Sequence, residues 1–411
     1  MPLPKNGIAA ETLLQQLDAL AAHDVDWKSG RAFSLAYHAG PEVLALANAA
    51  LAKFQSTNAL NVAAFPSLRR MQAEVVDIVA DLLHGGPDAA GFMTSGGTES
   101  ILLAVKAART RGRERGITAP EMVLPTTAHA AFEKGAAYFD VRSVRVPVGA
   151  DYKADASAMA AALTPQTVLL VASAPSYPQG VIDSVQQIAA LAAARDINCH
   201  VDACMGGITL PMLERLGQAV TPFDFRLPGV TSMSVDLHKY GYTAKGASVI
   251  VHRTKALRKQ QTFSTDNWLG GLYASSGVLG TKSGGPIAAA WAVLHHLGED
   301  GYLRLTRVAR AATLLLLEGL REIPGLRVLG DPEATLVAFT IDDADVFAVG
   351  EALAARGWVL DQQQPPPSLH CTVNAVHAPV IPALLADLRA VLAVVRTGGA
   401  RGSAKPYGRL E

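Results

Sequence analysis

The stretch VTSMSVDLHKYGYTAKG, residues 230–246, decides the fold of this chain. It begins with an apolar run typical of a buried strand, and this run leads into the pair His238-Lys239, with a glycine soon after. A lysine at the end of a buried strand, beside a histidine and aromatic residues, is partly removed from water. Such desolvation lowers the pKa of a lysine and frees its amine for imine formation. The alternative interpretation is a solvated surface lysine, the usual state of this residue type.

Short apolar runs alternate with amphipathic runs around this stretch. Buried strands are predicted at Glu121–Leu124, Val168–Ser173, Ile197–Ala203, Val230–Val235 and Ala247–Val251. Helices are predicted between them at Ile101–Arg109 and Ser184–Arg195. The alternation predicts an α/β fold, with a mainly parallel sheet flanked by helices. Ligands in such folds bind beyond the carboxyl ends of the strands, so the loops after these runs form the candidate site.

Changes of pattern divide the chain into three regions. An N-terminal helical segment covers residues 1–57, a large ligand-binding domain 58–285, and a smaller C-terminal α+β domain 286–411. Two early helices are predicted at Glu42–Phe54 and Met71–His84. The C-terminal region is predicted to hold helices at Pro286–Gly298, Tyr302–Leu320 and Val346–Arg356 and strands at Leu326–Leu329, Thr335–Ile341 and Ser368–Val373. The polar tail after Arg396 is expected to be loosely held.

The composition excludes several classes of protein. Half of the 411 residues are hydrophobic and 18% are charged, which excludes a disordered or fibrous chain. The formal net charge is zero, so we expect no nucleic-acid partner and interpret the basic run 109–116 as a solvated helix end. The three cysteines form no CxxC pair, and neither a disulfide scaffold nor a metal site is predicted. Neither a membrane span nor a secretory signal is recognisable, and we expect a soluble cytoplasmic protein.

The segment HVDACMGG, residues 200–207, places an acid, Asp202, near the end of a predicted strand. A lone aspartate at such a position often caps a helix. Its place in the chain, one helix and one strand before Lys239, favours another role. Pyridoxal phosphate (PLP) needs an acid that keeps its ring nitrogen protonated, because this makes the ring an electron sink. The small residues after Asp202 would let a flat ring lie close to the backbone.

Two further segments fit a PLP site. The segment TSGGTES, residues 94–100, opens a predicted helix, and its glycines, hydroxyls and helix N-terminus suit a phosphate group. It matches neither the dinucleotide-binding nor the Walker pattern, and many loop–helix junctions look like it. His129 stands just before a predicted helix, where a histidine caps the helix, packs in the core or stacks on a pyridine ring. A phosphate cradle, a ring stacker, an acid and an imine-forming lysine follow one another along the chain, which favours a PLP enzyme.

The sequence resembles the fold-type I PLP enzymes of the group II decarboxylase family, and more closely its sphingosine-1-phosphate lyases. The strings that carry the resemblance are FPSLRRMQAEVV (65–76), TSGGTESILLAVKAAR (94–109), AHAAFEKGAAYF (128–139), SAPSYPQGVIDSV (173–185), HVDACMGG (200–207), TSMSVDLHKYGYTAKGASV (231–249) and HLGEDGYL (296–303). The resemblance covers roughly residues 27–380, and HKYGYTAKG is its most specific string. It implies the fold-type I architecture, PLP as the cofactor, and a homodimer with shared active sites.

The resemblance also implies a role for each residue of the cofactor site. Lys239 would bind the cofactor aldehyde, and Asp202 would pair with the ring nitrogen. His129 would stack on the ring, with Cys204 near its other face. The cofactor phosphate would be held by Gly96, Gly97 and Thr98, with help from His238 and Ser234.

The resemblance places a second group of residues around the substrate. Two tyrosines would reach the reacting carbons, namely Tyr37, in SGRAFSLAY, and Tyr177, in SAPSYPQG. Lys245, Asn58 and Lys282 would belong to the region that binds the substrate phosphate. Tyr37 and Asn58 are candidates to come from the partner subunit of the dimer.

The chain departs from the lyase pattern at two positions. Asn61 stands where the lyases usually have a histidine, and Lys282 stands where an arginine is common. Lysine and arginine are not equivalent phosphate ligands, because only arginine offers a planar fork of donors. The asparagine keeps an amino-acid decarboxylase open as the alternative activity.

These residues predict a carbon–carbon lyase that acts on a phosphorylated long-chain amino alcohol. Tyr177 or Tyr37 would take the proton of the β-hydroxyl, with a pKa lowered by Lys245. The retro-aldol cleavage would give a fatty aldehyde and phosphoethanolamine. The alternatives are a PLP-dependent amino-acid decarboxylase, a retro-aldolase for a shorter phosphorylated amino alcohol, and a cofactor-binding protein without catalysis.

Overall fold

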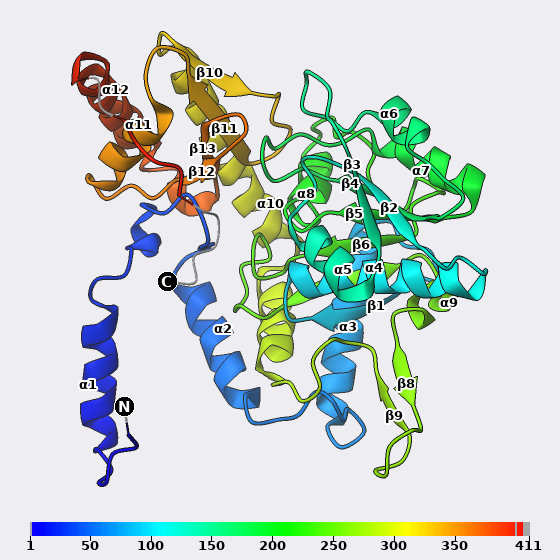
Figure 1. Cartoon of the computed structure of the whole chain (residues 1–411). Helices are drawn as coiled ribbons and strands as arrows, with labels where there is room; N and C mark the ends of the chain where they lie inside the picture. The colour runs from blue at the N-terminus through cyan, green and yellow to red at the C-terminus, as the bar shows by residue number, and fades with distance from the viewer. Residues whose placement is uncertain (1, 399–400, 406–411) are drawn as a thin grey trace.

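The larger part of the molecule is built on one seven-stranded sheet. The computed structural model describes residues 2–398 and 401–405. The strands are β1 (Ala90–Thr94), β2 (Glu121–Pro125), β3 (Arg142–Val146), β4 (Thr167–Ser173), β5 (Asn198–Asp202), β6 (Ser232–Val235) and β7 (Ser248–His252), and they lie in the order β1-β7-β6-β5-β4-β2-β3 (Figure 1). Neighbours from β6 to β3 run parallel, whereas β7 is antiparallel to β1 and β6. The predicted mainly parallel sheet is therefore confirmed.

Helices cover both faces of this sheet. They are α3 (Pro66–Leu82), α4 (Gly97–Glu114), α5 (Ala131–Phe139), α6 (Ala156–Ala161), α7 (Val185–Arg195) and α8 (Thr209–Arg215). Strand β4 is buried along its whole length, and its side chains alternate between the two layers. Leu169 and Val171 belong to the core that contains residues of α4 and α5, whereas Leu170 and Ala172 belong to the core that contains residues of α7 and α8.

A smaller domain follows at the C-terminal end. It holds an antiparallel sheet in the order β10-β11-β13-β12, made of β10 (Leu326–Leu329), β11 (Leu336–Ile341), β12 (Asp361–Gln363) and β13 (Ser368–Thr372). Helices α11 (Val346–Ala354) and α12 (Ile381–Gly398) complete it. A separate core with Trp358 and Phe339 lies inside this domain. The predicted α+β character is confirmed, but the short strand β12 was not predicted because its residues, Asp-Gln-Gln, carry no apolar pattern.

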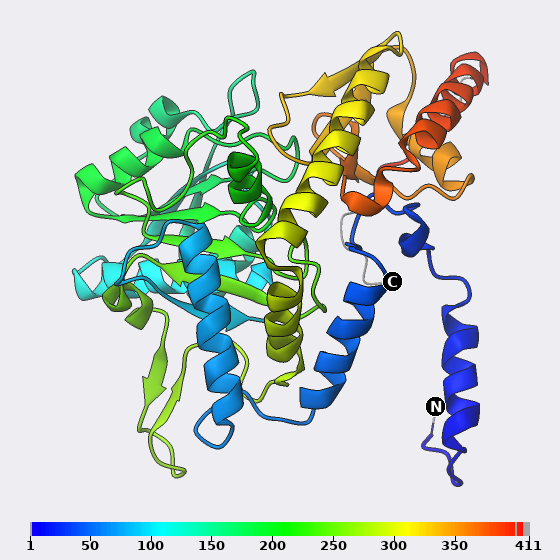
Figure 2. The ribbon, with the colours of Figure 1, turned by 180° about the vertical axis from the view of Figure 1, so that it is seen from behind.

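One long helix, α10 (Gly285–Arg321), joins the two parts, and Figure 2 shows it from behind. Its backbone leaves helical geometry at Gly298, with a φ of 54°, which agrees with the two separate helices predicted there. Residues before this point pack in the large core, and Leu316 and Leu320 pack in the small one. Helix α2 (Pro41–Phe54) lies along α10.

The N-terminal segment does not pack as one unit. Phe33 is buried in the small domain's core and stacks on His377, with ring centroids 4.0 Å apart. Helix α1 (Ala10–Ala21), by contrast, buries no residue and stands apart from the body of the molecule (Figures 1 and 2). The predicted domain boundaries stay a prediction.

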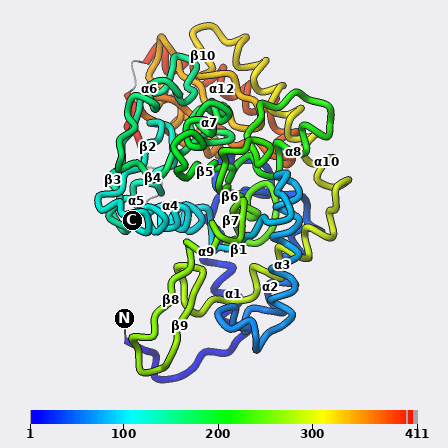
Figure 3. Tube along the Cα trace, turned by 90° about the vertical axis from the view of Figure 1, so that its right-hand side faces the viewer, coloured from blue at the N-terminus to red at the C-terminus, as the bar shows by residue number. Residues whose placement is uncertain are grey.

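A two-stranded hairpin projects from the large domain (Figures 1 and 3). Its strands are β8 (Phe263–Thr265) and β9 (Tyr273–Ser275), which follow the short helix α9 (Lys255–Lys259). Outside the hairpin, the chain also forms two short 3-10 helices, η1 (Trp27–Ser29) and η2 (Ala375–His377). Part of the glycine-rich stretch after residue 270 therefore forms a strand. Within residues 2–398 and 401–405, no helix has the length and apolarity that crossing a membrane requires.

Candidate active site

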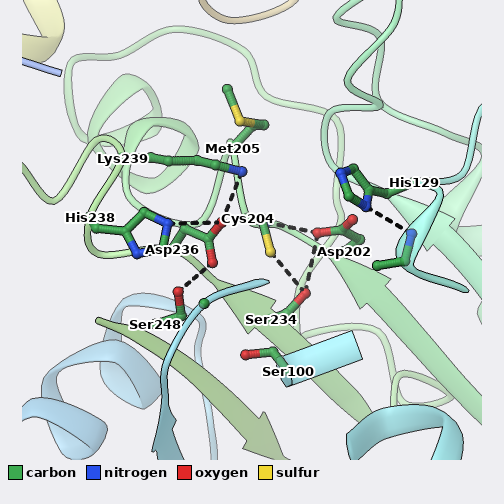
Figure 4. A network of polar contacts seen from close by, with 12 residues as sticks. Ser100, His129, Asp202, Cys204, Met205, Ser234, Asp236, His238, Lys239 and Ser248 are labelled. Carbon is green, nitrogen blue, oxygen red and sulfur yellow. Dashed lines mark hydrogen bonds and ion pairs between the residues drawn. The ribbon is translucent and has the colours of Figure 1, made fainter. Parts of the chain in front are cut away.

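A cavity of about 500 Å³ lies beyond the carboxyl ends of β4, β5 and β6. Lys239, Asp202 and His129 line it together with the glycine loop that opens α4. Figure 4 shows how these side chains converge from separate loops. The structure therefore brings together the four segments on which the sequence prediction of a PLP site rests.

Lys239 is paired with an acid that the sequence analysis did not single out. Its amine lies 2.8 Å from Asp236 Oδ2, and the Ser248 hydroxyl donates to Asp236 Oδ1 at 2.5 Å (Figure 4). Burial disfavours the Lys239 ammonium, but Asp236 outweighs it with help from Cys204 and Tyr37, and the pKa is raised well above its ordinary value. The predicted lowering of this pKa is therefore wrong, because the prediction considered desolvation without the counter-charge.

Asp202 ends β5 and is held in place by its neighbours. Its Oδ1 accepts hydrogen bonds from the Cys204 backbone N–H at 3.0 Å and from the Ser234 hydroxyl at 3.2 Å. Ser234 is also 3.2 Å from His200 Nε2, and burial lowers the pKa of His200 to about 4, so this imidazole is neutral at pH 7. The structure places Ser234 at the acid, where it orients Asp202.

His129 contacts the start of a helix, as one of its three predicted possibilities has it, and its stacking on a pyridine ring stays a prediction. Its Nδ1 accepts a hydrogen bond from the Ala131 backbone N–H at 3.1 Å, so the imidazole caps the start of α5. The same ring lines the cavity. Burial lowers the pKa of His129, although Asp202 raises it. Cys204 also lines the cavity, and burial raises the pKa of its thiol well above the ordinary value, so the sulfur stays protonated.

The glycine loop offers an anion site. Gly96 is the residue before α4, and the first N–H groups of a helix have no partner within the helix. A Cβ atom on Gly97 would lie 2.8 Å from both Asp236 Oδ2 and Cys204 Sγ, so only glycine lets the backbone approach this closely. His238 faces the loop, and its buried Nδ1 has no hydrogen-bond partner among the described residues. These N–H groups and the orphaned ring nitrogen fit the phosphate of PLP.

Glu99, another residue that the sequence analysis missed, ties this loop to a distant segment. Its Oε2 accepts from the Ser95 N–H at 2.6 Å, and its Oε1 accepts from the Val278 N–H at 2.7 Å. We call residues 276–282 the strap. Val278 and Leu279 of the strap line the cavity, so Glu99 holds one of the cavity walls.

Lys282 and Asn58 lie close together in the fold, and neither is among the residues that line this cavity. The Lys282 amine donates to the Met93 carbonyl at 2.8 Å, and burial lowers its pKa to about 8. The backbone of Asn58 pairs with that of Ser283 in an isolated antiparallel β-bridge, and Asn58 Nδ2 donates to Thr281 Oγ1 at 3.5 Å. Their predicted contact with a substrate phosphate stays a prediction.

Tyr37 and Lys245 meet at one side of the site. The Tyr37 hydroxyl donates to Met205 Sδ at 3.8 Å, and Met205 lines the cavity. The Lys245 amine lies 5.2 Å from the centre of the Tyr37 ring and donates to the Leu35 carbonyl at 2.9 Å. Burial lowers the pKa of Lys245, and the nearby Lys239 lowers it further. Tyr37 therefore contacts a residue that lines the cavity of its own chain, and its predicted contribution to a partner's site stays a prediction.

Tyr177, in the segment after β4, lines the cavity directly. Its hydroxyl donates to the carboxylate of Asp361, on β12 of the small domain. Its ring packs against His370, on β13, with ring centroids 4.3 Å apart. Neither Asp361 nor His370 was predicted, and only the pairing of the domains brings them to the site.

Comparisons with known proteins agree with this geometry. Residues 3–342 match the model of the pyridoxal-dependent decarboxylase conserved domain. Sphingosine-1-phosphate lyase 1 of Rattus norvegicus is 41% identical over 376 residues, and the match covers 91% of this chain and 66% of that protein. The sphingosine-1-phosphate lyase of Dictyostelium discoideum is 40% identical over 412 residues, which cover 99% of this chain and 78% of that protein.

Solved structures of PLP enzymes have the same fold as this chain. A sphingosine-1-phosphate lyase of Burkholderia pseudomallei superposes with a TM-score of 0.93 at 39% identity, over 96% of this chain and 93% of that one. A glutamate decarboxylase of Lactobacillus brevis reaches a TM-score of 0.84 at 19% identity, which shows a shared fold. The chain therefore belongs to the pyridoxal-dependent decarboxylase family, with PLP as its cofactor, and within that family to the sphingosine-1-phosphate-lyase-like members.

Proposed function

We propose that this chain is an aldehyde-lyase that cleaves a phosphorylated long-chain amino alcohol of the sphingosine-1-phosphate type. The products are a fatty aldehyde and phosphoethanolamine. The observation that carries the proposal is that two tyrosines approach the cavity of Lys239: Tyr177 lines it, and Tyr37, with Lys245 over its ring, contacts the lining residue Met205. A decarboxylase needs no group that accepts a proton from a substrate hydroxyl, whereas a retro-aldol cleavage does.

The cofactor contacts follow from the site geometry. Lys239 would bind the aldehyde carbon of PLP, which would supply the electron sink for carbon–carbon cleavage. Asp202 would pair with the ring nitrogen and keep it protonated, and Ser234 orients its carboxylate. Gly97 and the N–H groups that follow it would receive the phosphate.

The proton transfers are assigned to the tyrosines. Tyr177 takes the proton from the substrate's β-hydroxyl oxygen while the bond between the hydroxyl-bearing and amine-bearing carbons breaks. The hydroxyl oxygen becomes the aldehyde oxygen, and the amine-bearing carbon takes up a proton to give phosphoethanolamine. Lys245 adds positive charge beside Tyr37, where the substrate phosphate is expected.

The same proposal includes a homodimer with shared sites. Helix α1 exposes four leucines, namely Leu13, Leu14, Leu17 and Leu20, with exposed fractions of 42, 63, 59 and 76%. An isolated helix with such a surface is stabilised when a partner covers it. We expect a second copy to cover α1, and Asn58 and Lys282 to face the partner's substrate phosphate. The cytoplasmic location is also a proposal, which the three buried, unpaired cysteines support.

The dimer is tested by Leu14→Glu combined with Leu17→Glu. Sedimentation should show a dimer for the unaltered chain and a shift towards monomer for the variant. Gln15→Glu combined with Gln16→Glu is the matched control on the same helix and should leave the dimer intact. A monomeric unaltered chain would contradict this part of the proposal.

Product analysis tests the activity. The PLP-loaded protein is incubated with sphingosine-1-phosphate, and mass spectrometry detects long-chain aldehyde and phosphoethanolamine. Both products should appear with the unaltered chain and with the surface control Lys259→Ala, and both should be absent with Lys239→Ala. Release of CO₂ from an amino acid, without cleavage of the phosphorylated substrate, would identify the decarboxylase instead.

A further inference from the structure

One carboxylate of the small domain joins the segments that carry both tyrosines. Asp361 Oδ2 accepts the hydroxyl hydrogen bond of Tyr177. The same oxygen accepts the hydroxyl hydrogen bond of Ser34 at 2.6 Å, and Ser34 lies three residues before Tyr37. Tyr177 lines the cavity, whereas Asp361 is not among the residues that line it, so the carboxylate acts from behind the tyrosine.

The Tyr177 ring is fixed by a second residue of the same sheet. His370 is directly opposite Asp361 in the pairing of β12 with β13. Its side chain is fully buried, and its ring meets the Tyr177 ring at 36°. Burial lowers the pKa of His370 to about 4, although Asp361 raises it, so the ring is an uncharged platform at pH 7. His370 thus sets the plane of the phenol, and Asp361 sets the direction of its O–H bond.

We propose that Asp361 is the positioning residue of Tyr177 and that it makes this tyrosine a proton acceptor towards the substrate hydroxyl. A phenol oxygen both donates and accepts hydrogen bonds. Because the Tyr177 hydroxyl donates its hydrogen bond to Asp361, the lone pairs of the phenol oxygen remain available to accept a hydrogen bond from the substrate hydroxyl. As the substrate hydroxyl gives its proton to Tyr177, the phenol proton moves to Asp361. When the amine-bearing carbon is protonated, Tyr177 gives up its proton and regains one from Asp361, so the proton of the hydroxyl is the one that the carbon gains and no further reactant is needed.

This assignment replaces the role first expected of Lys245. A lysine beside the catalytic tyrosine would stabilise a phenolate, but the Lys245 amine lies over Tyr37. Tyr177 has a carboxylate as its neighbour, and a carboxylate works as a proton acceptor. The inference rests on the proposed lyase activity, and it adds a small-domain residue to the machinery of the large domain.

The test is a double-substitution cycle with Asp361→Asn and Tyr177→Phe. Asparagine keeps the size of the side chain and removes its charge. We expect Asp361→Asn to lower kcat about 10- to 100-fold, with KM within about 2-fold, because the group acts on the reacting proton. In the Tyr177→Phe background, Asp361→Asn should cause no further loss. Asp331→Asn, an exposed aspartate of the same domain, is the control and should leave kcat unchanged.

Two results would overturn the assignment. One is a fall in kcat of the same factor for Asp361→Asn with and without the Tyr177 hydroxyl, because Asp361 would then act independently of Tyr177. The other is a rise in KM with an unchanged kcat, which would place Asp361 in substrate binding. Holoprotein absorption and unfolding by urea show whether each variant keeps its fold and cofactor.

Failure of the lyase activity itself is recognised separately. If the unaltered, PLP-loaded chain leaves sphingosine-1-phosphate intact, the proposed function is wrong, whatever Asp361 does. Urea unfolding of the unaltered chain, Asp361→Asn, Tyr177→Phe and the double variant then tests only whether Asp361 and Tyr177 are in contact. Non-additive losses of stability support a direct hydrogen bond between Asp361 and Tyr177, and additive losses exclude it.

Discussion

The two tyrosines of the site stand in opposite electrostatic surroundings. Tyr37 lies beneath the Lys245 amine and near Lys239, and its hydroxyl donates to a thioether sulfur, which is a weak acceptor. Tyr177 donates to the carboxylate of Asp361. A proton can therefore pass from Tyr177 to this carboxylate. Two tyrosines near one cavity are thus expected to have different roles because their neighbours differ in charge.

Removing the hydroxyl groups should give the largest difference. We expect Tyr177→Phe to lower kcat about 100-fold and Tyr37→Phe about 10-fold, because the proton that Tyr177 accepts can pass on to the Asp361 carboxylate. Rapid-quench measurement of aldehyde formation compares the two variants. Equal losses, or a wild-type rate for Tyr177→Phe, would contradict the division of tasks.

The buried ammonium of Lys239 depends on one counter-charge, the carboxylate of Asp236. Asp236→Asn leaves the buried Lys239 ammonium without its partner, and we expect the cofactor-free variant to lose about 3 kcal/mol of unfolding free energy at pH 7. Burial alone would raise the pKa of Asp236, but Lys239 and His238 lower it below its ordinary 3.8, while the pKa of Lys239 is raised well above 10.5.

The sign of the pH dependence follows from these shifts. The lowered pKa of Asp236 gives stability that is present above pH 3.8 and is lost as the pH falls through the lowered value. The raised pKa of Lys239 gives stability that is present below pH 10.5 and is lost as the pH rises through the raised value. Urea unfolding of both proteins should therefore show a constant difference from about pH 5 to 9 that shrinks on either side. A difference that peaks near neutrality would argue against the pair.

Lys245→Met tests the contribution of the cation next to Tyr37. It removes the cation over the Tyr37 ring, and we expect kcat/KM for the phosphorylated substrate to fall about 10-fold. Its loss should multiply with that of Asp361→Asn, because the two residues act on different tyrosines. Lys259→Met serves as the surface control. If Lys245→Met no longer lowered kcat/KM in the Asp361→Asn background, Lys245 and Asp361 would belong to one coupled network.

The smallest effect is expected at His370. His370→Phe keeps an aromatic ring against Tyr177, so kcat should stay within about 2-fold, while thermal unfolding shifts down by a few degrees because the larger ring overfills a buried site. Steady-state kinetics and a melting curve measure both. A loss of kcat as large as that of Asp361→Asn would assign a chemical role to the imidazole.

Much of the large domain was predictable because its strands are buried and apolar. Strands β4, β5, β6 and β7 were predicted to within three residues, and the ends of β5 and β6 located Asp202 and Lys239. Strands β1 and β3 were missed, since neither is fully buried and their residues lack an uninterrupted apolar run.

The candidate site was predictable where local sequence carries it. Asp361 was missed because it belongs to a three-residue edge strand, and its meeting with Tyr177 depends on how two domains pack. Asp236 was quoted within the decisive motif, but its pairing with Lys239 is a matter of side-chain direction, which no spacing rule predicts. Glu99 was seen as part of a helix start, and its bond to Val278 joins residues far apart in sequence.

The single carboxylate of Glu99 has a thermodynamic consequence. It accepts hydrogen bonds from the loop at Ser95 and from the strap at Val278, so an anion that orders the loop also orders the strap. Coupling free energy is reciprocal. A second copy of the chain that steadies the strap would then tighten the loop's hold on the cofactor phosphate. The apparent affinity for PLP should rise with protein concentration over the range in which two chains associate.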